Sequence, residues 1–269
     1  MRNTVDRFNG RHQDYQAARP SYAQELLDWL GELHAPPERY TAADIGSGTG
    51  KLSAQLLAAG FRVCGVEPNP DMRGAAEALL GGDPRFSSVN GADRDTGLPD
   101  QSVDLVTAAQ AFHWFDGPAF ARECRRILRP GGRVFLVWNV RGPAPVNQAL
   151  AQVFREHCPG FHGFIGGMVE DDPRIRDFFG GAYEKRRFPN ALTLDRDRFL
   201  RRCFSSSYAL REEDADYAAF RAALEALFDT FASGGRLTQP NETVAYAGLP
   251  AAPRDEAFPE LKGRPYQKK

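Results

Sequence analysis

A short run of glycines at the end of an apolar stretch is the strongest chemical signal in the sequence. Residues 43–50 have the sequence ADIGSGTG and join a β-prone run to a helical pattern. Glycines in such a turn let the backbone approach a ligand closely, and the N–H groups at the start of the helix favour an anionic group. The segment therefore predicts a loop that binds a small molecule. The candidate contacts in it are Gly46, Ser47, Gly48 and Gly50.

Two nucleotide-phosphate motifs with similar glycine content do not fit this spacing. A Walker A loop needs a glycine where Ile45 stands and a serine or threonine where Leu52 stands, so Lys51 is not a P-loop lysine. A dinucleotide fingerprint has the spacing G-x-G-x-x-G, whereas the third glycine here, Gly50, comes one residue early. The loop is predicted to bind another kind of ligand.

An acidic residue after the next predicted strand adds to this signal. Glu67 lies in the segment VEPNPDM, 17 residues after Gly50. Together with the G-x-G-x-G spacing and Asp44 two residues ahead of it, Glu67 resembles the pattern of class I S-adenosylmethionine-dependent methyltransferases. The resemblance implies S-adenosylmethionine as cofactor, S-adenosylhomocysteine as product, Glu67 on the ribose hydroxyls and Met72 against the adenine. Asp44 either contacts the cofactor or holds loop amides or an ordered water beside it.

Two further segments extend the resemblance. The sequence GADRDTGLPD at 91–100 is similar to the segment whose acid faces the adenine amino group, and either Asp93 or Asp95 takes that place. The sequence DYQAARP at 14–20 matches the N-terminal segment of a small-molecule branch related to quinone-biosynthesis and trans-aconitate methyltransferases. This match implies that Tyr15 and Arg19 lie near the methionine end of the cofactor, although an arginine in such a place is also an ordinary solvated charge.

The sequence AAQAFHWFD at 108–116 resembles the fourth-strand motif of the same branch, whose members face the methyl group from this position. The resemblance implies that Gln110 and Trp114 contact the cofactor, with an aromatic face against the sulfonium. Histidine titrates near neutral pH, so His113 is the candidate general base for an oxygen or nitrogen acceptor. Ordinary packing of an aromatic loop is the alternative for this segment.

The elements that must position these residues alternate in type along the chain. Five apolar β-prone runs are separated by helical patterns, which predicts a parallel sheet covered on both faces. The expected strands are 40–45, 61–66, 85–89, 103–108 and 133–138, and the expected helices between them are 52–59, 70–80 and 118–128. Two late strands at 183–188 and 243–247 complete the expected fold. It is an α/β, Rossmann-like doubly wound sheet of about seven mostly parallel strands with a reversed last strand, plus a cap inserted after the fifth strand.

The chain is expected to form one methyltransferase domain over residues 1–249, followed by a loosely attached tail at 250–269. Ser21 and Gln24 predict a capping box ahead of an amphipathic helix in an N-terminal cover segment, 1–36. The rhythm of strands and helices breaks after Asn139, which predicts a substrate cap at about 141–180. Further helices are expected at 147–157, near 173–179 and around 217–231.

Composition excludes several classes of protein. The 34 Lys and Arg residues nearly balance the 35 Asp and Glu residues, which disfavours nucleic acid or an anionic membrane as partner. The four cysteines have neither metal-ligand nor disulfide-framework spacing, so no metal is expected. No apolar run is long enough for a membrane span, and the first residues lack a signal-peptide pattern. The sequence thus predicts a soluble cytoplasmic protein, monomeric or homodimeric.

The predicted function is transfer of the methyl group of S-adenosylmethionine to a small-molecule acceptor, at oxygen. Two alternatives stay open: a cofactor-binding partner or sensor without turnover, and a methyltransferase with a peptide or protein substrate. A nucleic-acid methyltransferase is disfavoured, because the fourth strand lacks an Asn/Asp-Pro-Pro-Tyr type ending and no basic accessory region is present. The cap is expected to decide the acceptor, which its sequence does not name.

Overall fold

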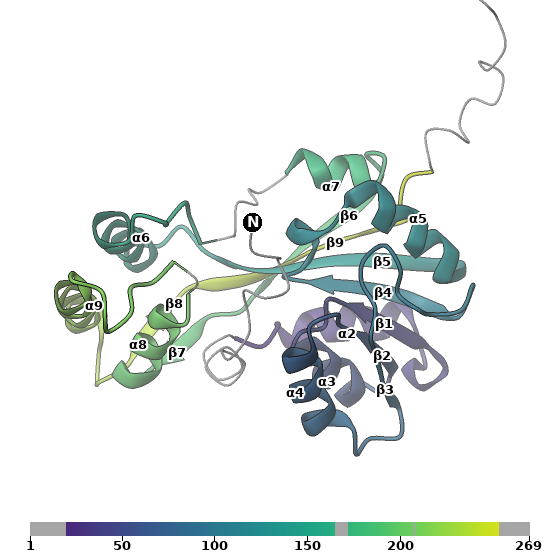
Figure 1. Ribbon diagram of the computed structural model, residues 1–269, viewed down its shortest axis with the longest axis horizontal. Helices are drawn as coiled ribbons and strands as arrows, with labels where there is room; N and C mark the ends of the chain where they lie inside the picture. The colour runs from purple at the N-terminus through teal and green to yellow at the C-terminus, as the bar shows by residue number, and fades with distance from the viewer. Residues whose placement is uncertain (1–19, 165–171, 207, 253–269) are drawn as a thin grey trace, which may run out of the picture.

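The computed structural model describes residues 20–164, 172–206 and 208–252, and a mixed sheet runs through its centre (Figure 1). The strands of this sheet are β1 (Thr41–Ile45), β2 (Arg62–Val66), β3 (Phe86–Val89), β4 (Val103–Ala109), β5 (Leu128–Arg141), β6 (Tyr183–Pro189) and β9 (Asn241–Gly248). Their order is β3-β2-β1-β4-β5-β9-β6. The first five strands pair in parallel, whereas β9 is antiparallel to both β5 and β6. The predicted Rossmann-like sheet with a reversed last strand is confirmed.

Helices cover both faces of the sheet. The α-helices of the described residues, which include those of a separate lobe, are α2 (Gln24–Leu33), α3 (Lys51–Ala58), α4 (Pro70–Leu80), α5 (Gly117–Ile127), α6 (Pro145–His157), α7 (Pro173–Phe178), α8 (Arg196–Phe204) and α9 (Tyr217–Phe231). In Figure 1, α2, α3 and α4 lie on one side of the sheet and α5 and α7 on the other. Two neighbouring residues determine where α4 begins. The Asn69 side chain accepts hydrogen bonds from the amides of Asp71 and Met72, and Pro70 is the first helical residue.

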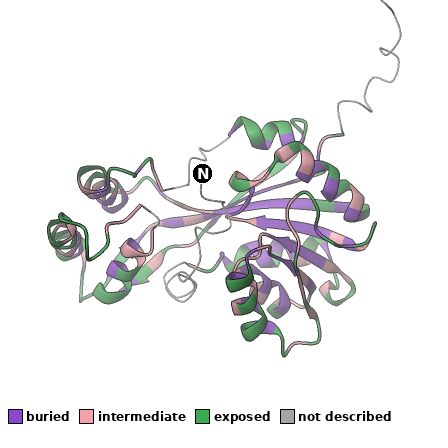
Figure 2. Cartoon of the chain, in the orientation of Figure 1, coloured by how far each residue is buried: buried purple, intermediate pink, exposed green. Residues whose placement is uncertain are grey.

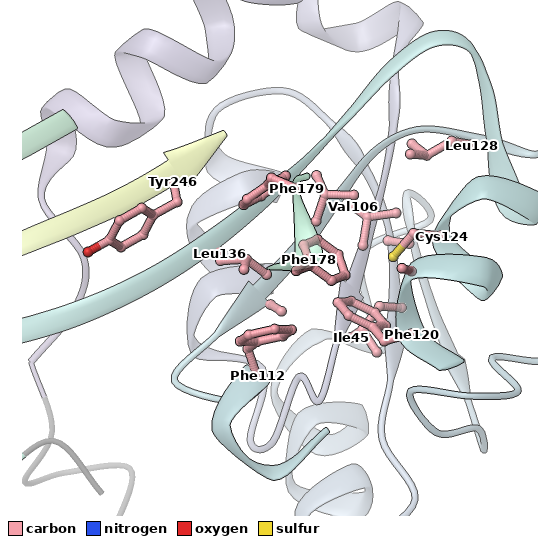
Figure 3. Close-up of a cluster of buried hydrophobic side chains, with 14 of the residues drawn as sticks. Ile45, Val106, Phe112, Phe120, Cys124, Leu128, Leu136, Phe178, Phe179 and Tyr246 are labelled. Carbon is pink, nitrogen blue, oxygen red and sulfur yellow. The ribbon is translucent and has the colours of Figure 1, made fainter. Parts of the chain in front are cut away.

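The central strands are apolar on both faces, as a doubly covered parallel sheet requires. Along β5, Val134 and Leu136 pack toward α5 and α7, whereas Phe135 and Val137 pack toward α2 and α3. Figure 2 shows the central strands largely in the colour of buried residues, whereas the edge strands β3 and β6 are partly exposed. In Figure 3 the rings under α5 and α7 gather around Phe178, with the Phe112 ring centroid 5.1 Å away. These two cores hold the strand ends, and so the site, in a rigid frame.

A separate helical lobe extends from one end of the sheet (Figure 1). It consists of α6, α8, α9 and a small antiparallel sheet of β7 (Leu192–Leu194) and β8 (Leu237–Gln239). It has its own apolar core, in which Phe154 of α6, Phe199 of α8 and Phe220 of α9 are fully buried. The lobe is therefore built from two distant insertions, one after β5 and one between β6 and β9.

This lobe differs from the cap expected at 141–180. The segment α7 packs on the sheet instead, where Ile175 and Phe178 join the core beside α5. The sequence analysis predicted α6 and α9 but not α8, β7 or β8. Their short amphipathic patterns acquire a buried face only when both insertions meet, which local periodicity does not reveal.

Two predictions about the ends of the domain are wrong. The N-cap of α2 is Ala23, without a side-chain cap from Ser21, because the Ala23 amide donates 2.9 Å to the Thr243 hydroxyl of β9. The expected tail does not begin at Pro250, because the Ala251 amide donates to the Phe178 carbonyl at 2.7 Å. The Arg125 side chain also donates to the carbonyls of residues 250 and 251. Residues 253–269 lie outside the described residues.

The described parts of the chain were compared with the requirements of a membrane-spanning helix and of a metal site. No helix there has the length and apolarity needed to cross a membrane. No cluster of three His, Cys, Asp or Glu side chains there has the arrangement of a metal site.

Candidate active site

A cavity of about 370 Å³ opens at the carboxyl ends of β1, β2 and β4. Strand order reverses between β1 and β4, and such switch points are where doubly wound sheets bind their ligands. The predicted site residues that line the cavity are Asp44, Gly46, Ser47, Gly48, Glu67, Met72, Asp93, Gln110 and Trp114. Gly50 and His113 are not among the described lining residues, and Tyr15 and Arg19 lie outside the part of the chain that the structure describes.

The glycine loop forms the floor of this cavity, and its glycines have different roles. Gly46 has φ +68°, and a Cβ on it would come within 2.8 Å of the Ala111 Cβ. A Cβ on Gly50, at φ +80°, would come within 2.8 Å of Leu80 of α4. Gly46 thus keeps the loop open next to the β4 end, while Gly50 lets α4 pack on the loop. The prediction that Gly50 contacts the cofactor is not supported by its position.

Glu67 joins β2 to the glycine loop. Its side chain is 7% exposed, and its two carboxylate oxygens accept from the amides of Gly48 and Asn69, each at 2.9 Å. Burial raises the pKa of Glu67, and the two amide donors oppose that shift. Each carboxylate oxygen keeps a further lone pair for a ligand hydroxyl. The loop amide therefore holds Glu67 in place beside the cavity.

Asp44, near the end of β1, is 1% exposed. Its carboxylate accepts from the hydroxyls of Ser53 and Thr107, each at 2.8 Å. Burial raises the pKa of Asp44 to about 6, against the opposing effect of these two donors. The roles left open for Asp44, a contact with the cofactor or support of loop amides or an ordered water beside it, stay predictions. Asp44 lines the cavity while tying α3 to β4 by side-chain hydroxyls.

The choice between Asp93 and Asp95 is decided by position. Asp93 lines the cavity, and its carboxylate accepts from the Asp116 amide at 2.9 Å. Asp95 is exposed and accepts only a local bond from the Gly97 amide at 3.3 Å. Asp93 is thus the acid of this segment that faces the cavity.

Gln110 has an unusual backbone conformation at the end of β4. Its φ of +55° is rare for a residue with a side chain and is typical of functional turns. The Gln110 amide donates to the Val137 carbonyl at 2.8 Å, and its side-chain amide donates to the Asn139 carbonyl at 3.1 Å. Asn139 also lines the cavity and accepts from Thr243 and Asn190. The sequence analysis missed Asn139, since only its position late in a strand marks it.

The aromatic side chains of the turn after β4 lie in different environments. Phe112 is buried under α5 and α7, while Trp114 and Phe115 line the cavity. Trp114 is 45% exposed, and the His113 ring lies 4.7 Å from its ring centroid. His113 packs against Trp114 and is not among the described residues that line the cavity, and its role as general base stays a prediction.

A second pocket of about 60 Å³ adjoins the first. Both pockets share Pro20, Gln110 and Asn139. The remaining described walls come mainly from the helical lobe and its connections: Arg141, Phe164, Arg202, Ser205, Ser206 and Tyr208. None of these was a predicted site residue, because they lie on segments that only the tertiary structure brings together.

The sheet order, the glycine loop and the acid at the end of β2 define a Rossmann-like domain that binds a nucleoside cofactor. Comparisons identify its family. Residues 43–136 match the methyltransferase domain family. An uncharacterized methyltransferase-like protein from Schizosaccharomyces pombe is 30% identical over 213 residues, which span 76% of this chain and 79% of that protein. The chain belongs to the class I S-adenosylmethionine-dependent methyltransferases.

Solved structures agree with this assignment. A proposed type II methyltransferase from Anaeromyxobacter dehalogenans aligns at TM-score 0.63 and 25% identity, covering 86% of this chain and 97% of that chain. A methyltransferase from Thiobacillus denitrificans, solved in complex with S-adenosylhomocysteine, shares the fold at TM-score 0.51 and 17% identity, covering 89% and 96%. Both structures are named as methyltransferases, and their fold is the one that the sheet order of this chain indicates.

The chain spans about half the length of some of the curated relatives that it matches. An uncharacterized methyltransferase from Mycobacterium tuberculosis is 42% identical over 127 residues. This alignment spans 47% of this chain and 49% of the relative.

Proposed function

We propose that this protein transfers the methyl group of S-adenosylmethionine to a small-molecule acceptor, at an oxygen atom. The observation that carries the proposal is the pair of adjoining pockets. The larger is lined by the glycine loop and Glu67, and the smaller by the helical lobe. A cofactor and an acceptor bound in these two places would meet at Gln110 and Asn139, which line both.

The larger cavity has the chemistry that the cofactor needs. Glu67 offers carboxylate lone pairs to a ribose, Met72 offers an apolar surface to a purine, and Asp93 offers an acceptor to an amino group. Gly46 and Gly48 have no Cβ, so space beside the backbone turn stays open for a ligand. When bound, the cofactor supplies a methyl group activated by a sulfonium.

The protein's own contribution is mainly alignment. Holding two reactants at near-attack distance is worth up to roughly 7–11 kcal/mol of the barrier. The aromatic faces of Trp114 and Phe115 at the cavity wall suit a neighbouring cation and exclude water from it. The Gln110 side-chain amide donates to the Asn139 backbone carbonyl, and Gln110 and Asn139, which line both pockets, are placed to orient an acceptor.

An acceptor oxygen that is already ionised fits this site best. A hydroxyl oxygen has to give up its proton during transfer, and His113, the candidate base, does not line the cavity. Asp44 and Glu67 are already engaged in internal hydrogen bonds. An ionised oxygen needs no base, so alignment alone would suffice.

The helical lobe supports a small acceptor over a protein. It encloses a pocket of about 60 Å³, which suits one end of a small molecule and not a peptide segment. We therefore assign the substrate-binding role to the lobe, in place of the expected segment 141–180. We further propose that the protein acts in the cytoplasm as a monomer or homodimer, without nucleic acid or membrane; light scattering of the purified protein checks the oligomeric state.

Titration calorimetry tests the cofactor part of the proposal. S-adenosylhomocysteine should bind, while NAD and ATP should give no signal. Binding of NAD with no response to S-adenosylhomocysteine would contradict the proposed function. A matched Glu67→Ala protein should lose the S-adenosylhomocysteine signal.

Turnover is tested with methyl-labelled cofactor and a size-fractionated cell extract. Label in the small-molecule fraction supports the proposal. Label in the protein fraction indicates a protein methyltransferase, and no label in either fraction, with S-adenosylhomocysteine binding intact, indicates a partner or sensor.

A further inference from the structure

Helix α5 holds one turn in the wall of the larger cavity. The turn, residues 92–95, is closed by two backbone hydrogen bonds between its ends, and it carries Asp93 into the cavity wall. The amide of Asp116, the N-cap of α5, donates to Oδ2 of Asp93 at 2.9 Å. Further along the same helix, Glu123 accepts from Thr96, the residue that follows the turn. The turn is therefore attached to α5 at two points.

The contact between Glu123 and Thr96 is buried and consists of two hydrogen bonds. Glu123 is 7% exposed, and Thr96 is fully buried. Oε1 of Glu123 accepts from the Thr96 amide at 2.8 Å and from the Thr96 hydroxyl at 2.6 Å. The same hydroxyl accepts from the Leu98 amide at 3.2 Å. One carboxylate oxygen thus fixes both the backbone and the side chain of the residue that follows the turn.

Glu123 is ionised at neutral pH. Its carboxylate accepts from Nε of Arg126 at 2.8 Å and from Nη2 of Arg126 at 2.7 Å. Burial raises the pKa of Glu123, but the hydrogen bonds from Arg126 and Thr96 outweigh this effect and hold the pKa below its ordinary value. A charged acceptor makes shorter and stronger hydrogen bonds than a neutral one, so the bonds to Thr96 are strong.

Stability alone does not explain a buried carboxylate at this position. The residues one turn before and one turn after Glu123, Phe120 and Ile127, are apolar members of the core under α5. Removing an ion pair from water costs free energy that the attraction between the charges often fails to recover, so an apolar residue would stabilise this face equally well. What Glu123 offers and an apolar residue lacks is a fixed acceptor for Thr96.

We propose that Glu123 is a positioning residue for recognition of the cofactor's base: it fixes Thr96, and Thr96 fixes the turn that presents Asp93 to the amino group of the base. This inference rests on the proposed function, in which Asp93 accepts from that amino group. The strength of a hydrogen bond depends on distance and angle, so a turn that is free to shift would weaken recognition of the amino group more than binding of the rest of the cofactor. Glu123 acts through Thr96 and without contact to the cofactor.

Two ligands that differ at the base test the proposal by titration calorimetry. S-adenosylhomocysteine is compared with S-inosylhomocysteine, in which a carbonyl oxygen replaces the amino group. Wild type should bind S-adenosylhomocysteine at least about tenfold more tightly, because a charge-assisted hydrogen bond to Asp93 is lost in the second ligand. Asp93→Asn should remove most of this preference, since an amide can face either group.

The failure of the inference differs from the failure of the proposed function. Wild type that binds both ligands equally, or a preference that is unchanged in Asp93→Asn, overturns the inference and leaves the cofactor assignment intact. Wild type that does not bind S-adenosylhomocysteine contradicts the proposed function, and the inference with it.

Substitutions at the contact locate the effect. Glu123→Ala should lower the preference for S-adenosylhomocysteine at least about fivefold, whereas Glu123→Gln should retain most of it because it keeps an oxygen that accepts from Thr96. Thr96→Val removes the hydroxyl donor at nearly constant volume and leaves the amide, so its preference should fall by an intermediate factor. If Glu123→Ala does not fold, Thr96→Val decides, and an unchanged preference in that variant overturns the proposal.

Two controls on α5 separate positioning from stability. Arg126→Ala breaks the ion pair but leaves both bonds between Glu123 and Thr96, so the thermal midpoint should fall while the preference stays within about threefold of wild type. Arg122→Ala, at an exposed position of the helix, should change neither quantity. An unchanged preference in folded Glu123→Ala, or an equal loss in Arg126→Ala, would overturn the proposal, because Glu123 would then act only through stability.

Discussion

The two halves of the site differ in how far apart their hydrogen-bonding partners lie along the chain. In the cofactor half, Gly48 and Glu67 are 19 residues apart and Asp44 and Ser53 are nine apart. The exception is Thr107, the other partner of Asp44, which is 63 residues away on the neighbouring strand. In the helical lobe and at its junction, the partners are 37, 93 and 104 residues apart: Arg202 with Gln239, Asn147 with Pro240, and Thr243 with Asn139. The cofactor half is assembled by neighbouring strand–helix units, and the acceptor half by long-range closure.

This difference has a functional meaning. The methyltransferase domain match ends at residue 136, before the chain enters the lobe, and the mycobacterial similarity spans about half the chain. Function depends on sites built on a shared fold, so one fold can serve different acceptors. Under the proposed function, specificity for the acceptor therefore resides in the half whose residues are least constrained by local spacing.

The largest expected effect is on the cofactor half. Glu67→Ala removes two charge-assisted contacts to the ribose, each worth about 1.5–3 kcal/mol, so S-adenosylhomocysteine affinity should fall by roughly two to four decades. Titration calorimetry measures the change. Because the Gly48 and Asn69 amides lose their acceptor, the thermal midpoint should also fall. The control Glu77→Ala, on an exposed part of α4, should leave affinity unchanged, and an unchanged affinity in Glu67→Ala would move the ribose contact elsewhere.

A substitution in the core of the lobe should lower stability and leave cofactor affinity nearly unchanged. Phe154 is fully buried at the centre of the lobe, with the rings of Phe161 and Phe220 about 5 Å away. Phe154→Ala should lower the free energy of unfolding by about 3–5 kcal/mol, measured by urea denaturation. Affinity for S-adenosylhomocysteine should stay within about threefold, since the cofactor cavity has its own core. Phe231→Ala, at a partly exposed position of α9, is the control; a parallel loss of cofactor affinity in Phe154→Ala would show that the halves are not independent.

A third prediction concerns the pH dependence of stability, to which Asp44 of the cofactor half contributes. Asp44 has a pKa of about 6 in the folded protein, against 3.8 for the ordinary group. Between about pH 4 and pH 6 the folded protein holds a proton that the unfolded chain has released, so stability falls as the pH rises through this window. Asp44→Asn should remove about 3 kcal/mol of this decline, from roughly two pKa units at 1.36 kcal/mol each.

Urea denaturation of wild type and Asp44→Asn at several pH values from 4 to 7.5 measures the difference. The exposed Asp100, substituted as Asp100→Asn, serves as the control and should show the wild-type slope. Identical slopes for wild type and Asp44→Asn would contradict the buried carboxyl as the source.

The smallest effect is expected at His113. Its ring packs against Trp114 and does not line the cavity, so His113→Gln should change turnover by less than about tenfold, whereas loss of a general base costs about 10²–10⁴. The measurement is a pH–rate profile with an acceptor found in the extract assay. A large loss of turnover together with loss of an imidazole-like titration would restore His113 as the base.

Much of the cofactor half was predictable because strands, turns and acids there follow one another at short spacing. The strands and helices between residues 40 and 138 were expected within about five residues of their positions, and Gly46, Ser47, Gly48, Glu67 and Met72, which the sequence indicated as cofactor contacts, line the cavity. The sequence did not show which of Asp93 and Asp95 faces the cavity, because a shift of one residue relative to the motif exchanges the two side chains. The sequence also did not separate His113 from Trp114, because the short turn Phe112–Trp114 directs consecutive side chains to different environments.

The sequence by itself determined that this chain forms a parallel α/β sheet with a cofactor loop, because periodic apolar runs and glycine positions act within a few residues of each other. Only the tertiary structure decided where Asn139, Arg141 and Arg202 meet. Their segments are brought together by the lobe core and by pairing of β5 with β9, and neither has a local signal. A side chain's exposure and its partners depend on surfaces contributed from far along the chain, so the acceptor pocket follows from packing and not from spacing.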